Sequence, residues 1–575
     1  MLNGLNLIRF SAALLALSLL LPWQAHAETE AELSKQASLT GSFLASHYAR
    51  SSGDIDGAIH FLRRVHRNQP DDAEISAQLI SLMLLDGQVR EATQIAAGLP
   101  ETGGKDPLVL LVQLLQSVKN NKMDEASRRV DDAFEIGVGQ LWLPLISSWI
   151  EVVRRPPDEP VVIQQLSGNL SRAVPILHYH LALINEYAGF TEAAATNFKD
   201  ALENPKNPPP RVMEQMIRFY SRHGSPALLT PLVKDYLALY PEMATAANAP
   251  KPTMMDGVAE VLFSMGSVMR SAGITHDALA YLHLSLYLKP DNASALMSLG
   301  DAYSDVRLYE RANRLGYAKI REQERLYSDA QVRAAINLER MGDPPGALRQ
   351  LDKLVEHGAG TRSAMIARGD LLRRHHRYNE AIHAYTQVLN SLDALSKEDW
   401  ALLFARAVSF ERTQQWDDAE NDLMKALVLA PDQPDVLNYL GYSWMVRGVK
   451  LDEASQMIEK ALAARPNDPQ IIDSMGWSLY LRGRYEDAAR YMERAVSLLP
   501  SDPAVNDHLG DIYWKLGRKT EARFQWERSL SFNPEKAEAE LILRKIEHGL
   551  DALSSAATGK AVLMSEQAGS EGALR

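Results

Sequence analysis

Apolar and small residues return with a period of about 34 residues over the second half of the chain. Pro466, Pro500 and Pro534 are spaced by 34 residues, and Pro431 precedes Pro466 by 35. Between successive prolines the apolar positions follow helical spacing twice, with a turn in between. The pattern therefore predicts an all-α chain made of repeated helical hairpins, in which each proline ends a unit because it cannot continue a helix.

Small residues occupy fixed positions within these hairpins. Gly476 and Gly510 lie in the first helices of two consecutive units, and Ala488 and Ala522 lie in the second helices. Larger side chains there would push closely crossing helices apart. Turn glycines such as Gly483 and Gly517 are expected to take the left-handed conformation that closes a helix.

The C-terminal part of the chain resembles the tetratricopeptide-repeat family, in the segments VLNYLGYSWMVRG, DSMGWSLYLRGRYEDAARYMERAVSLLP and NDHLGDIYWKLGRKTEARFQWERSL. The resemblance implies a right-handed superhelical solenoid of antiparallel helix pairs, whose first helices line a concave side where partners bind. We count about thirteen units along the chain, more than the ~3 that a continuous core requires.

The parts of the chain differ in how closely they match the repeat pattern. Residues 28–135 are predicted to form N-terminal repeat units, 136–258 degenerate helical hairpins, and 259–549 the C-terminal array. The tail 550–575 is rich in small and polar residues and is predicted to be disordered. Prolines interrupt the middle part at positions 156, 157, 160 and 208–210.

The first 27 residues have the layout of a signal peptide. The basic Arg9 precedes the apolar run 10–21, and Ala25 and Ala27 then provide the small residues that a signal peptidase requires. We predict cleavage after Ala27 and an exported, periplasmic protein without a transmembrane anchor. The alternative is an uncleaved anchor, but the apolar run is shorter than the ~20 residues of a membrane span.

Charge and cysteine content narrow the possible functions. The formal net charge of −12 disfavours nucleic acid as a partner, because phosphate binding requires clustered basic residues. The chain has no cysteine, which excludes disulfides, thiolate metal sites, cysteine catalysis and lipid attachment at an N-terminal cysteine.

Local motifs give no candidate for catalysis. Gly103–Lys105 lacks the upstream glycine of a phosphate loop, and Asp54–Gly57 lacks the later ligands of a calcium loop and is read as a turn. His178 and His180 fall on different sides of a helix, and His375–His376 lies at a helix end. We therefore predict no catalytic residue, no metal site and no cofactor.

Aromatic and acidic residues fill the outward-facing positions predicted for the first helices of the last three units. These positions are Asn438, Tyr442, Met445, Asp473, Trp477, Tyr480, Asp507, Asp511 and Trp514. Aromatic side chains are enriched at the centres of binding sites, so we predict a partner-binding groove here. Alternatively, Trp477 and Trp514 pack against a neighbouring helix. The carboxylates disfavour a clamp for a partner's terminal carboxylate.

The sequence thus predicts a non-catalytic scaffold or adaptor that binds one or more envelope proteins in a groove of its repeats. Its layout is similar to that of tetratricopeptide-repeat adaptors of the Gram-negative envelope. The alternative is a glycan-binding or export component that presents substrate to a catalytic partner, since aromatic residues can stack on sugars. The sequence leaves the oligomeric state open.

Overall fold

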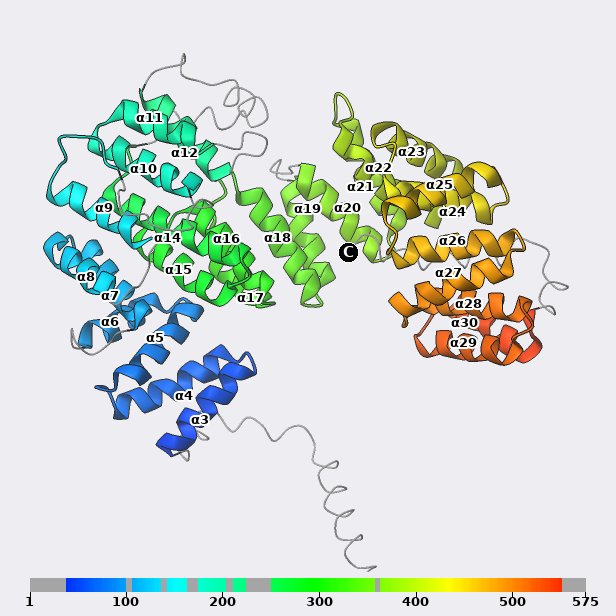
Figure 1. Ribbon diagram of the computed structural model, residues 1–575, viewed down its shortest axis with the longest axis horizontal. Coiled ribbons are helices and arrows are strands. Elements are labelled where there is room, and N and C mark those ends of the chain that lie inside the picture. Colours follow the sequence, from blue (N-terminus) through cyan, green and yellow to red (C-terminus); the bar gives the residue numbers. More distant parts are fainter. Residues whose placement is uncertain are drawn as a thin grey trace, which may run out of the picture. The chain divides into compact units, whose positions relative to one another are not determined.

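The computed structural model describes residues 38–99, 106–135, 142–162, 174–202, 210–223, 250–356 and 362–550. Within these ranges the chain is helical and contains no strand, which confirms the all-α prediction. Residues up to Gln350 and residues from Leu351 form two compact units (Figure 1). The predicted signal peptide 1–27 lies outside the described residues, as does all but the first residue of the predicted tail 550–575.

The N-terminal unit consists mainly of helical hairpins. Its helices are α3 (Leu39–Ser51), α4 (Ile55–Asn68), α5 (Ala73–Asp86), α6 (Val89–Gly98), α7 (Pro107–Lys119), α8 (Met123–Glu135), α9 (Leu143–Arg154), α10 (Val174–Ala188), α11 (Thr191–Asp200), α12 (Pro210–His223), α14 (Met254–Ser271), α15 (Thr275–Leu288), α16 (Ala293–Asp305), α17 (Tyr309–Arg311), η3 (Ala312–Gly316), η4 (Tyr317–Lys319) and α18 (Tyr327–Arg340).

The C-terminal unit is a more regular series of hairpins, and α19 (Pro344–Glu356) contains the boundary between the units. Its further helices are α20 (Arg362–Arg374), α21 (Tyr378–Asn390), η5 (Lys397–Asp399), α22 (Trp400–Arg412), α23 (Trp416–Leu429), α24 (Pro434–Val446), α25 (Leu451–Ala464), α26 (Pro469–Leu481), α27 (Tyr485–Leu498), α28 (Pro503–Lys515), α29 (Lys519–Ser531) and α30 (Lys536–His548). Every described helix is too short or too polar for a bilayer crossing.

Helix starts and turns follow local chemistry. The Asp468 side chain accepts hydrogen bonds from two amides of the first turn of α26, and Pro469 follows at the first helical position, where it needs no donor. The predicted turn glycines Gly483 and Gly517 have φ values of 75° and 79°, which confirms the left-handed closure. Asp54 accepts from the Gly57 amide, so that motif is indeed a turn before α4.

Two units accommodate one additional residue in different ways. Between α24 and α25 the turn is longer, and Lys450 takes a left-handed conformation (φ 48°) just before α25 begins. In the unit of α16 the additional residue lies inside the second helix, where Ala312–Gly316 forms a π-helical turn. Such single π turns insert one residue without ending a helix.

The helices α14 and α15 pack against elements far away in sequence. Helix α15 contacts α5, α6 and α7, and α14 contacts α9 and α10. Residues 278–285 of α15 are all buried, although a repeat helix that contacts only its neighbours would leave one face in solvent. A helix that is apolar on every side indicates burial on every side, and the α15 segment THDALAYLHLSLYL carries that signal.

Polar contacts also join α5 to this distant part of the unit. The Tyr303 hydroxyl donates to the Leu85 carbonyl oxygen at 2.6 Å, and Arg311 Nε donates to Asp86 at 2.9 Å. His283 lies 2.7 Å from the Tyr303 hydroxyl, and burial lowers the pKa of His283 to about 3. The buried imidazole is therefore neutral at physiological pH.

Any side chain at position 87 is expected to destabilise this contact. Its φ is 80°, and a Cβ atom would lie 2.7 Å from Cε1 of His283. We expect Gly87→Ala to destabilise the N-terminal unit by about 2 kcal/mol, through both backbone strain and overpacking. Urea unfolding measures the loss, and Gly53→Ala (φ 82°, open surroundings) is the control that isolates the strain. Equal losses in both variants would contradict the packing described here.

Candidate functional site

The nine residues of the predicted groove lie on three consecutive first helices, α24, α26 and α28. We call them the first-helix face. Six of the nine are buried, namely Met445, Asp473, Trp477, Asp507, Asp511 and Trp514. The expectation that all nine face outward is therefore wrong, and neighbouring side chains and α30 are the reason.

Trp477 is enclosed by aromatic rings on both faces. It stacks on Tyr480 of its own helix at 4.6 Å between ring centroids, and on His508 of α28 at 4.2 Å. His508 Nδ1 in turn lies 2.9 Å from Asp473 Oδ1. Only 4% of Trp477 is exposed, so the alternative that this side chain packs between helices holds.

Helix α30 covers the last of the three helices. Lys545 Nζ donates to Asp507 at 2.7 Å and to Asp511 at 2.8 Å, and all three side chains are buried. The Trp526 indole donates to the other oxygen of Asp511 at 2.9 Å. Trp514 lies against Trp526 and beneath Gly549, where a Cβ atom would lie 2.3 Å from the Trp514 ring. The two acidic residues of α28 thus share one buried cation within the chain.

Three positions of the first-helix face remain half-buried: Asn438, Tyr442 and Tyr480. Leu481, next to Tyr480, is 43% exposed. The Asn438 Oδ1 atom is buried and has no donor within the described residues. These residues form the part of the face that is open to a partner.

The carboxyl groups near α30 have raised pKa values. Burial, reinforced by Asp507 and opposed by Lys545, raises the pKa of Asp511 to about 6. Burial, with Glu535 and Asp507 nearby, also raises the pKa of Glu538 to about 6. Each group holds its proton in the folded unit at a pH where the unfolded chain has released it.

This difference predicts a pH effect on stability. Unfolded Asp and Glu titrate near pH 4, so between about pH 4 and 6 the folded state binds more protons, and its stability rises as the pH falls. We expect the C-terminal unit to gain about 1–2 kcal/mol between pH 7.5 and pH 5. Urea-dependent hydrogen exchange of α28 measures this gain. Asp511→Asn should reduce the gain, and an unchanged pH dependence in that variant would contradict the assignment.

A polar cleft lies in the N-terminal unit, at a place that the sequence did not indicate. It has a volume of about 600 Å³ and lies between α12, the first turns of α14 and α16, and residues 321–326. Seven basic and five acidic side chains line it. No motif marks this site, because its residues come from several segments between Leu183 and Leu326.

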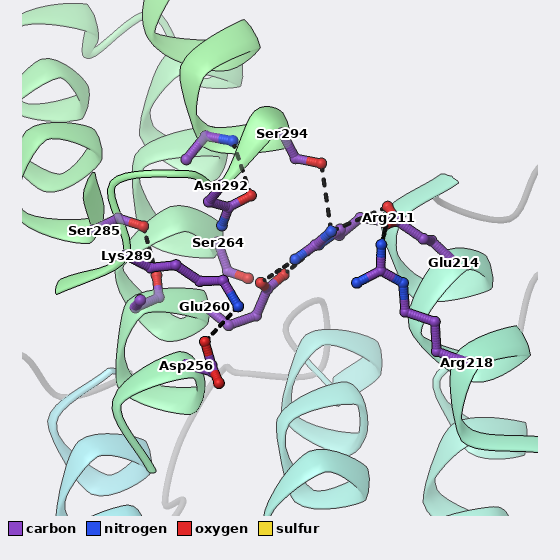
Figure 2. A network of polar contacts seen from close by, with 12 residues as sticks. Arg211, Glu214, Arg218, Asp256, Glu260, Ser264, Ser285, Lys289, Asn292 and Ser294 are labelled. Atoms are coloured by element: carbon purple, nitrogen blue, oxygen red, sulfur yellow. Dashed lines mark hydrogen bonds and ion pairs between the residues drawn. The ribbon is translucent and has the colours of Figure 1, made fainter. Parts of the chain in front are cut away.

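Arg211 is the centre of the polar network at the cleft (Figure 2). Its guanidinium donates to both oxygens of Glu260, at 2.8 and 2.6 Å, and to Glu214 at 3.0 Å. The Tyr179 hydroxyl donates to Glu260 at 2.7 Å from the other side. Burial alone would raise the pKa of Glu260, but the pairing with Arg211 outweighs it and holds the pKa below its usual value. The buried pair therefore remains ionised.

Comparison with protein families identifies segments of this chain as tetratricopeptide repeats. Models described as tetratricopeptide repeat match residues 49–115 in the N-terminal unit, and residues 332–396, 366–434, 404–469 and 474–537 farther along the chain. The last two matched segments cover the hairpins of the first-helix face except for residues 470–473 of α26. A comparison with curated proteins gives no match.

Several solved structures are similar to this chain over part or most of its length. A tetratricopeptide repeat protein from Parabacteroides merdae is 15% identical over 50% of this chain and 97% of its own, with a TM-score of 0.34. MamA of AMB-1 is 24% identical over 29% of this chain and 97% of its own, with a TM-score of 0.25. A chain in the Cut9-Hcn1 structure is 13% identical over 89% and 96%, with a TM-score of 0.38. At these identities the similarity concerns the fold alone.

Proposed function

We propose, because this chain is a tetratricopeptide-repeat protein, that it acts as a non-catalytic scaffold that binds segments of partner proteins. The observation that carries the proposal is the half-buried cluster of Asn438, Tyr442 and Tyr480 on two adjacent first helices, α24 and α26. Large aromatic side chains on a rigid helical surface are typical of binding centres, because they bury much area with little loss of rotamer entropy.

The internal pairing of the acidic side chains limits which chemical groups a partner would present to this face. Asp507 and Asp511 are paired with Lys545, and Asp473 contacts His508, so the face does not present a row of free negative charges. A partner is therefore held by apolar contacts with the two tyrosines and Leu481, and by hydrogen bonds to groups such as Asn438. The partner segment would therefore present apolar and uncharged polar side chains to this face.

The glycan-binding alternative has less support at the two tryptophans than a protein partner has. Stacking on a sugar requires a free aromatic face, and both faces of Trp477 are covered by Tyr480 and His508. Trp514 is covered by Trp526 and the segment around Gly549. A protein segment across the half-exposed tyrosines fits the observed surface better than a stacked sugar.

The cellular setting belongs to the same proposal. The predicted signal peptide, with cleavage after Ala27, supports export to the periplasm. Partners would then be envelope proteins that the scaffold positions relative to one another. Sequencing the N-terminus of the exported protein tests the cleavage, and a chain that still begins at Met1 would support the anchor instead.

Replacing Tyr442 and Tyr480 by alanine is expected to weaken partner binding without unfolding the chain. Two truncations at a binding centre, at ~2 kcal/mol each, predict a loss of affinity of at least a hundredfold. The partner is first identified by crosslinking in the native cell, and its affinity for purified variants is then measured by titration calorimetry. Circular dichroism checks that helicity is retained.

The matched control removes two aromatic residues from second helices. Tyr491 of α27 is half-buried and Phe524 of α29 is 58% exposed, so Tyr491→Ala with Phe524→Ala removes a similar apolar area elsewhere. The control is expected to bind normally. Normal binding by the Tyr442 and Tyr480 variant, or an equal loss in both pairs, would contradict the proposed site.

A further inference from the structure

The polar cleft of the N-terminal unit has a surplus of positive charge in a protein whose net charge is −12. Its seven basic side chains outnumber its five acidic ones. Charge in a concave surface of low dielectric focuses the local field more strongly than the same charge on an open surface. One of the seven, Arg222, pairs at 2.8 Å with Glu186, which does not line the cleft, so a surplus of about one positive charge remains, opposite in sign to the net charge of the protein.

The acidic groups of the cleft already have partners. Glu260 and Glu214 bind Arg211, and Glu214 also binds Arg218 at 2.6 Å. Asp256 pairs with Lys289, Glu324 pairs with Arg321 at 2.7 Å, and Asp291 lies 4.0 Å from Arg321. These pairs neutralise most of the charge on the floor and walls of the cleft.

Two basic side chains at the rim have no such partner. Lys251, just before α14, and Arg325, just before α18, are exposed and have no acidic partner within the described residues. Both line the cleft. Their charges are available to a ligand without first breaking an internal ion pair.

The start of α16 adds donors to the same cleft. Ala293 and Ser294 line the cleft in the first turn of this helix, and their amides have no acceptor in the described part of the chain. Asn292, which is only 5% exposed, also lines the cleft, and its Nδ2 is buried without an acceptor. Unpaired N–H groups at a helix start favour a negatively charged ligand.

We propose that this cleft binds an acidic peptide segment of a partner protein, with Lys251 and Arg325 holding its carboxylates. The walls also offer side-chain amide oxygens, in Gln215 and Gln323, which suit the N–H groups of a peptide backbone. A site for a lone inorganic anion would gain nothing from these acceptors. The volume of about 600 Å³ is in the usual range for ligand sites, ~300–1,000 Å³.

The site is independent of the first-helix face, because all of its residues belong to the N-terminal unit. A scaffold with both sites would bind two chemically different partner segments. Ion pairing at the exposed rim should weaken as salt is added, since exposed charges are screened at physiological ionic strength.

The test measures binding of a fluorescein-labelled hexaglutamate peptide to the full chain by fluorescence anisotropy. We expect saturable binding that weakens at least tenfold in the double variant Lys251→Glu with Arg325→Glu. The matched control reverses two exposed basic residues outside the cleft, Arg67→Glu with Arg128→Glu, and should change the affinity less than twofold. Circular dichroism verifies that both variants fold.

The remaining outcomes would overturn the proposal. Absence of binding to the unmodified chain, or equal losses in the two double variants, would show that the cleft is not the site. Displacement of the peptide by inorganic phosphate at equal concentration would assign the cleft to a small anion instead. The Tyr442→Ala and Tyr480→Ala variant should bind hexaglutamate normally, so failure of this proposal and failure of the proposed function are distinguishable.

Discussion

Replacing Lys545 by methionine is expected to release α30 and destabilise the C-terminal unit by about 3–5 kcal/mol. Lys545 is the buried cation between Asp507 and Asp511, and its removal leaves two carboxylates close together in a buried site. Removing one partner of a buried ionic group typically costs this much, because the remaining charge has no compensation. Urea unfolding, followed by hydrogen exchange of α28 and α30, measures the loss.

The control for this variant is on the same helix. Lys536 is exposed at the start of α30, so Lys536→Met removes a charge without uncovering an acidic group, and should change stability by less than about 0.5 kcal/mol. Equal stability of the two variants would mean that α30 is not held by Lys545. The first-helix face would then extend over α28, as the sequence suggested.

The second large effect is expected at Gly510. A Cβ atom at this position would lie 2.4 Å from Cδ1 and Nε1 of Trp526, whose indole is fixed by its hydrogen bond to Asp511. We therefore expect Gly510→Ala to destabilise the C-terminal unit by about 2–3 kcal/mol, despite the better helix propensity of alanine. The denaturation midpoint of α28, measured by hydrogen exchange in urea, gives the value.

Gly476 is the matched comparison, because it occupies the equivalent position one unit earlier. A Cβ atom there would meet the terminal Cε atom of Met492 at 3.0 Å, and that flexible end can move. Gly476→Ala should therefore change stability by less than about 1 kcal/mol. If both alanine variants lose the same stability, the packing of Trp526 against Gly510 is not what the structure shows.

The repeat was predictable because it is local. Turn glycines, helix-starting Asp-Pro pairs and small residues at crossing points act within one hairpin, and the turns at Gly483 and Gly517 have the expected conformation. The repeat pattern, however, predicts the same role for Gly476 and Gly510. Their difference depends on whether residue 492 or 526 is flexible, which the spacing alone does not show.

The burial of the predicted face depended on contacts beyond one unit. Lys545 reaches Asp507 from 38 residues away, and no repeat position encodes that contact. One available signal was the spacing of Ile542 and Lys545 on one face of α30, since residues three apart lie together on a helix. Reading Trp514 as exposed required the last unit to be uncovered, and it is not, whereas Trp477 is covered by Tyr480 of its own helix and His508 of α28.

The distant packing of α15 and the polar cleft were missed for a related reason. A solenoid prediction assumes contact between neighbouring units only, whereas α15 contacts α5, α6 and α7. The cleft likewise combines Arg211, Lys251 and Arg325 from three separate segments. The largely apolar segment of α15 was the feature of the sequence that indicated packing beyond neighbouring units.

The most direct test of the scaffold function is site-specific photocrosslinking in the native cell. A photoreactive phenylalanine is placed at position 442 or 480 on the first-helix face, or at position 491 or 524 on the second helices. We predict that positions 442 and 480 crosslink to the same partner protein and that positions 491 and 524 do not. Crosslinking only from positions 491 and 524, or equally from all four, would contradict a partner site on the first-helix face.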